Sequence, residues 1–140
     1  MNADLKLIRS TFRAISEDVD GFSIRFYRNL FTANPEVRGM FPEDMSAQRK
    51  KLTQTLAVAV GRLGEPELMI PMLRNLGARH VAYGVVAEQY PVVAEALISA
   101  MRDHLGGTFD EQAEAAWRVV LGWIAEHMMA GATELEINAA

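Results

Sequence analysis

The chain has 140 residues, of which 50% are hydrophobic and 23% charged, and its mean hydropathy is +0.03. This is the balance of one ordinary globular domain, and it excludes both a disordered chain and a membrane-embedded one. The sequence has no cysteine, which excludes disulfides, thiolate-bound zinc, iron–sulfur clusters, a cysteine nucleophile and covalent c-type haem attachment.

Charge and hydropathy argue against two further classes of partner, nucleic acids and membranes. A net charge of −4 and a pI near 5.4 argue against nucleic-acid binding, and the basic run Arg49-Lys50-Lys51 is too short to reverse that. The longest apolar run, residues 119–125, falls well short of the roughly 20 residues of a membrane span. The N-terminus lacks the basic start and apolar core of a secretory signal. We therefore expect a cytoplasmic protein without a nucleic-acid or membrane partner; its oligomeric state stays open.

Apolar residues in the first half of the chain recur at helical spacing. A stripe from Leu5 to Ile15 predicts the first helix, and a stripe from Phe22 to Leu30 predicts the second, after a break around Asp20-Gly21. Asn34-Pro35 begins a short turn of helix, because proline suits a first helical turn. Residues 39–44 are expected to be irregular, and a third long helix carries the stripe from Leu52 to Leu63.

The second half is also predicted to be helical. Pro66 and Pro71 suggest a connection that leads into a short helical segment over residues 72–83. The next helix opens near Pro91 and stops at Gly106-Gly107, and a last one spans residues 109–129. Residues 131–140 are expected to fray. The prediction is an all-α chain of about six longer helices in one domain, residues 1–140.

Few residues stand out as carriers of chemistry. The chain has no glycine-rich phosphate loop, no two-histidine zinc motif and no nucleophile elbow. Three histidines remain, and imidazole is the commonest metal ligand. His104 and His127 lie close to apolar stripes, so we interpret both as partly buried structural residues. His80 lies on the short predicted helix, and by itself it too would be structural more often than not.

Two longer runs carry a specific resemblance. The segment Leu76-Gly-Ala-Arg-His-Val-Ala-Tyr-Gly-Val-Val-Ala-Glu-Gln-Tyr-Pro-Val-Val93 resembles the proximal-histidine region of bacterial haemoglobins, and residues 26–41 resemble an earlier region of the same proteins. The resemblance is to single-domain bacterial globins and to the globin part of flavohaemoglobins, and it covers residues 4–130. It implies a globin fold around haem b, held without a covalent bond, and reversible binding of dioxygen and other diatomic gases.

The resemblance also implies roles for particular residues. His80 matches the proximal iron ligand, and Phe41 matches a phenylalanine that packs on the porphyrin. Tyr27 matches a distal tyrosine whose phenol can donate a hydrogen bond to the bound gas. Gln48 falls on the distal helix position, four residues before Leu52 and on the same face, and both belong to the expected pocket. Because the preceding loop varies within the family, Ala47 and Lys51 are alternatives for the distal position.

Two further features of the flavohaemoglobin pattern are matched less well. They are the cations at the haem edge and the glutamate that helps to hold the proximal histidine. Lys51 and Arg79 are candidates for the haem propionates, although a solvated surface charge is the commoner role for either. Tyr90 matches the tyrosine that, with a glutamate, holds the proximal histidine in flavohaemoglobins. The glutamate itself is replaced by Ala132, and the nearest acid is Glu134. This departure weakens the expectation of an unusually basic, electron-donating imidazole.

Three functions remain open from sequence. The leading one is a globin that binds dioxygen at a five-coordinate iron. The second is a nitric oxide dioxygenase or peroxidase-like detoxifier; since no flavin- and nicotinamide-binding domain fits before residue 140, it would need a separate reductase. The third is a haem-free interaction module on the same fold, but such modules generally lose the proximal histidine that His80 matches.

Overall fold

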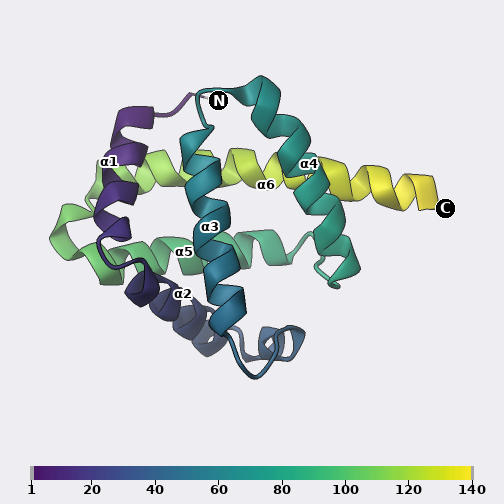
Figure 1. The fold of residues 1–140 in the computed structure, drawn as a ribbon, viewed down its shortest axis with the longest axis horizontal. Helices are drawn as coiled ribbons and strands as arrows, with labels where there is room; N and C mark the ends of the chain where they lie inside the picture. Colours follow the sequence, from purple (N-terminus) through teal and green to yellow (C-terminus); the bar gives the residue numbers. More distant parts are fainter. Residues whose placement is uncertain (1, 140) are drawn as a thin grey trace.

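The computed structural model describes the backbone of residues 2–139 and the side chains of residues 2–134. Within that range the chain is helical and has no strand, as predicted (Figure 1). Six α-helices and two short 3-10 helices follow one another: α1 (Leu5–Ser16), α2 (Val19–Ala33), η1 (Pro35–Met40), α3 (Ser46–Gly61), α4 (Pro66–Ala82), α5 (Gln89–Leu105), η2 (Gly106–Thr108) and α6 (Glu111–Ala139).

Aspartates cap the starts of three helices. Asp4 accepts a hydrogen bond from the backbone N–H of Leu7, at 3.1 Å, at the start of α1. Asp18 accepts one from Gly21 at 3.1 Å, and Asp110 accepts one from Ala113 at 2.9 Å. Such a bond satisfies a backbone donor that the first turn leaves free. Because Asp18 caps α2, the break between the first two helices lies just before it and not at Asp20-Gly21.

The helix α4 begins earlier than its prolines suggest. It starts at Pro66 and continues through Pro71, so the predicted connection before residue 72 is wrong. Pro66 lies in the first turn, where the missing N–H costs nothing. Pro71 removes one backbone hydrogen bond, but Met69 and Leu73, which are 0% and 1% exposed, fix this part of the helix in the core. Burial outweighs the local penalty of one proline.

The last helix ends later than predicted. Its stripe suggests an end near Met129, yet α6 continues to Ala139, so the expected frayed tail is helical through that residue; Ala140 lies outside the described residues. The reason is a long-range contact, because α4 crosses α6 between Met128 and Gly131 (Figure 1). There Arg74 of α4 forms an ion pair with Glu134 of α6.

The helices pack in two groups that are joined where α6 contacts α5 and α1. In one group α2 packs along α5, while α3 rests on α1 and α2; in the other, α4 packs on α6 (Figure 1). No helix within residues 2–139 combines the length and hydropathy that crossing a membrane requires. Most predicted stripes are buried, although Val93 is 37% exposed. The largest fully buried side chains are those of Ile8, Ile15, Phe22, Leu30, Met69, Leu73, Ile98, Met101, Trp117 and Val120.

Burial of α5 predicts a matched pair of stability effects. Ile98 is 0% exposed, whereas Ile24 on α2 is 51% exposed. Ile98→Ala should lower the free energy of unfolding by about 2–5 kcal/mol, since it leaves a cavity in a close-packed core. Ile24→Ala makes the same chemical change at the surface and should cost less than about 1 kcal/mol. Denaturant unfolding of both variants measures this, and similar losses would contradict the packing of α5.

Candidate functional site

His80 lies in the last turn of α4, and its ring is held by its own helix. Its Nδ1 atom is 2.7 Å from the backbone carbonyl oxygen of Leu76, four residues earlier. A carbonyl can only accept, so in the neutral imidazole this contact places the proton on Nδ1 and leaves a lone pair on Nε2. A histidine that donates from one nitrogen and offers the other is the form that binds a metal ion.

The partners of His80 differ from those that the resemblance suggests. Among the described side chains, the ring next to it is that of Tyr83, with centroids 6.1 Å apart and planes at 75°. No described contact joins His80 to Tyr90, which is half-buried and whose pKa is raised by burial. Glu134 forms its ion pair with Arg74. The acceptor for Nδ1 is therefore the uncharged Leu76 carbonyl.

A second group of predicted residues meets between α2 and α3. Tyr27 is 5% exposed, and its hydroxyl oxygen accepts a hydrogen bond of 3.1 Å from Nε2 of Gln48. Phe41 meets the Tyr27 ring edge-on, with centroids 5.6 Å apart and planes at 71°. Phe31 lies against both rings, at 5.8 Å and 5.4 Å. The structure thus brings together three residues that the sequence singled out.

The Tyr27 phenol is arranged as a hydrogen-bond donor. Because Gln48 supplies the hydrogen in their mutual bond, the hydroxyl hydrogen of Tyr27 remains available for a further acceptor. Burial raises the pKa of Tyr27, and the smaller opposing effects of Gln48 and Arg49 do not cancel it. The phenol is therefore protonated around neutral pH. The alternatives to Gln48, Ala47 and Lys51, are both exposed.

The other predicted contacts lie at the surface or are half-buried. Lys51 and Arg79 are exposed, and neither has an ion pair among the described side chains. Leu52 is half-buried on α3. The structure does not bring these three together, so their roles stay predictions.

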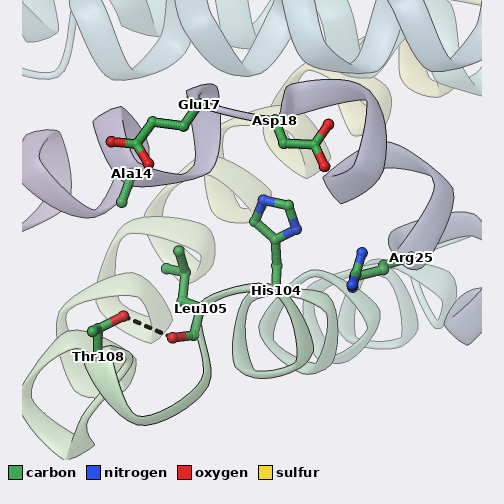
Figure 2. A pocket seen from close by; sticks show the side chains of 7 residues that line it. All are labelled: Ala14, Glu17, Asp18, Arg25, His104, Leu105 and Thr108. Atoms are coloured by element: carbon green, nitrogen blue, oxygen red, sulfur yellow. Dashed lines mark hydrogen bonds between the residues drawn. The ribbon is translucent and has the colours of Figure 1, made fainter.

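A separate hollow of about 460 Å³ lies where the corner between α1 and α2 faces the end of α5 (Figure 2). His104 projects into it, half-buried, with its ring edge-on to Phe22 at 5.8 Å. His127 packs likewise on Trp123, at 4.7 Å. Both histidines pack against aromatic rings, in line with a structural role. The hollow is lined by Ala14, Glu17, Asp18, Arg25, His104, Leu105 and Thr108.

Comparison with known families decides what this arrangement is. The globin family profile matches residues 24–128, a span that contains Tyr27, Phe41, Gln48, His80 and Tyr90. The chain belongs to the globin family. Its helices form a globin fold, and membership implies haem and a diatomic ligand.

Individual relatives agree with this assignment. A bacterial globin from Campylobacter jejuni is 26% identical with a TM-score of 0.83, and the match covers 94% of this chain and 96% of that one. An engineered carbene transferase from Rhodothermus marinus, described as a candidate nitric oxide dioxygenase, is 25% identical with a TM-score of 0.85, over 96% and 94% of the two chains. Flavohemoproteins from Bordetella parapertussis and Bacillus subtilis are 25% and 27% identical over 86% and 89% of this chain. The globin spans about a third of their length, 31% and 32%.

The residues present fit the haem that the family implies. His80 presents an imidazole nitrogen with a free lone pair, which is the ligand type that haem iron takes in globins. Apolar side chains on separate elements are left only half-covered, as expected where a flat apolar group completes the packing. They include Phe41, Leu52, Leu56, Leu76 and Tyr90.

Sequence reasoning missed several neighbours of these residues. The carbonyl of Leu76 holds His80, and Phe31 flanks Tyr27; each lies four residues from its partner. The helical repeat could have found both, since residues four apart share a helix face. Two buried glycines, Gly77 and Gly131, gave no signal, because glycine inside a helix indicates only that the helix is less stable there.

The raised pKa of Tyr27 predicts a loss of stability in alkali. The folded state favours the neutral phenol, so its contribution is complete below the unfolded-state pKa of about 10 and is lost as pH rises through the higher folded-state pKa. Tyr27→Phe removes this titration, so the free energy of unfolding should fall less steeply above about pH 10. Urea unfolding at several alkaline pH values measures the slope. A slope equal to that of the unchanged globin would contradict the burial of the phenol.

Proposed function

We propose that this globin binds haem b through Nε2 of His80 and reversibly holds dioxygen on the side of Tyr27 and Gln48. The observation that carries the proposal is the hydrogen bond from Gln48 to the hydroxyl of buried Tyr27, because it leaves a donor hydrogen free. Haem would supply an iron that can bind a diatomic gas.

On the distal side, the two polar residues have different tasks. Gln48 orients the phenol, and Tyr27 then directs its O–H toward a gas that carries partial negative charge. In surroundings as apolar as those made by Phe31 and Phe41, such a hydrogen bond is stronger than in water. The arrangement favours high affinity for dioxygen and slow release.

On the proximal side, the Leu76 carbonyl fixes the ring of His80 without adding charge. A carboxylate acceptor would form a stronger, charge-assisted bond and make the imidazole a better electron donor. A neutral acceptor favours holding the gas over breaking its bond. Phe41, Leu52 and Tyr90 would cover the porphyrin, and the exposed Lys51 and Arg79 would face its propionates.

Nitric oxide dioxygenation is the second candidate, and the relatives favour it. Several are flavohemoproteins, and the Rhodothermus marinus protein is described as a candidate nitric oxide dioxygenase. In that case a reductase would supply the electrons in the cytoplasm. Sustained consumption of nitric oxide, with a flavin reductase and a nicotinamide cofactor, would support it. A single stoichiometric conversion that then stops would support gas binding alone.

Absorption spectra of the oxidised, dithionite-reduced and oxygen-exposed protein test the proposed ligation. The reduced form should be five-coordinate and should give a stable oxygenated spectrum. His80→Ala should lose this spectrum, and added imidazole should restore a reduced five-coordinate form by replacing the missing ligand. The matched variant His127→Ala should keep the spectrum, since His127 packs on Trp123. Absence of a haem band, even with added hemin, would leave only the haem-free interaction module.

Tyr27→Phe should increase the rate of oxygen release. Losing one hydrogen bond to a partly charged acceptor costs about 1.5–3 kcal/mol, which corresponds to roughly tenfold or more in rate. Gln48→Leu should give a smaller increase, because the phenol remains but loses its orientation. Gln54→Leu, at an exposed position of the same helix, is the matched control. Stopped-flow release that is unchanged in Tyr27→Phe would overturn the distal assignment.

A further inference from the structure

The helices α4 and α6 approach each other backbone to backbone at two buried glycines. A Cβ atom at Gly77 of α4 would overlap the carbonyl group of Met128 on α6. A Cβ atom at Gly131 of α6 would overlap the carbonyl group of Arg74 on α4. The contact is reciprocal, since each glycine faces the carbonyl group of the residue that lies one turn before the other glycine. Neither overlap could be relieved by turning a side chain, because both obstacles are backbone.

This crossing lies next to the residues that hold the proposed ligand. Gly77 directly follows Leu76, whose carbonyl binds Nδ1 of His80, and it precedes His80 by one turn. A rigid helix transmits a shift at Gly77 to both residues. The ion pair between Arg74 and Glu134 joins the same two helices.

Of the two helices, α4 has fewer close neighbours. Within residues 2–139 its close packing is against α6, whereas α6 also packs against α1 and α5 (Figure 1). A group inserted between them would therefore displace α4 and carry His80 with it. Packed interiors have no slack to absorb such an insertion.

We propose that Gly77 and Gly131 are positioning residues that set where His80 Nε2 stands relative to the rest of the globin. Because both Cβ atoms are missing, α4 can lie close enough to α6 to put His80 where it can bind the iron. Other glycines lack this role; a Cβ atom at Gly122, on α6 itself, would meet nothing within 4 Å. The inference rests on the proposed binding of haem by His80.

The test uses the haem-loaded, reduced protein and the iron–histidine stretching band in resonance Raman spectra. Gly77→Ala and Gly131→Ala should each shift the band in the same direction, while Gly122→Ala should leave it unchanged. Either methyl group alone already separates the helices, so the double variant should shift the band by less than the sum. A purely stabilising role for the glycines would lower the unfolding midpoint without moving the band.

The outcomes separate this inference from the proposed function. If the unchanged globin shows no iron–histidine band, the ligation by His80 fails. If the band is present but neither folded glycine variant shifts it, the positioning role is overturned.

If neither variant folds, hydrogen exchange in the full chain without haem decides. A crossing that holds α4 should protect the amides of residues 74–80 as well as those of residues 128–131. Free exchange in α4 beside a protected α6 would overturn the inference.

Discussion

The backbone contact between α4 and α6 places the helix that carries His80, the proposed iron ligand. Within residues 2–139 the close packing of α4 is on α6, so the place of His80 depends mainly on this interface, where Gly77 and Gly131 let the two helix backbones meet. Glycine usually weakens a helix by about 1 kcal/mol relative to alanine. Here the missing Cβ atom permits an approach of the two backbones that any side chain would prevent. Apolar burial at Leu73 and Met128, which are 1% and 8% exposed, stabilises the same crossing.

The proposed distal side is anchored on a different helix. Tyr27 belongs to α2, and α2 is fixed to α5 by close packing along the two helices and by Asn29, whose amide donates to Ser99 at 3.0 Å and to Asp103 at 2.9 Å. The helices that hold α2 and α4, which are α5 and α6, pack on each other in turn. There Arg102 of α5 donates a hydrogen bond to Glu114 of α6 at 2.7 Å. The separation between Tyr27 and His80 is therefore set by α5 and α6, which contribute neither residue. The proposed distal donors are therefore held separately from the proposed ligand.

The sequence predicted the class of fold and most helices, because apolar spacing reports directly which face is buried. It failed at Pro71 and beyond Met129, where packing between distant segments overrides a local signal. The proposed site residues came from the resemblance, and the bond from Gln48 to Tyr27 agrees with it. The Leu76 carbonyl could be found from its four-residue spacing to His80 but not from its residue type, since every residue carries a carbonyl. A glycine that permits a close approach likewise reads as any other glycine until its neighbour is known.

The balance between holding a gas and acting on it depends on the charge behind His80. Glu134 is the acid nearest to the position where the flavohaemoglobin pattern has its glutamate, and its carboxylate pairs with Arg74 at the crossing. The acceptor left for Nδ1 is a neutral carbonyl. The Glu134 carboxylate thus joins α4 and α6, and His80, the proposed ligand, keeps an uncharged partner. Under the proposed function, Tyr27 and Gln48 would hold a gas strongly while His80 would add little electron density to it, which is the combination that reversible binding requires.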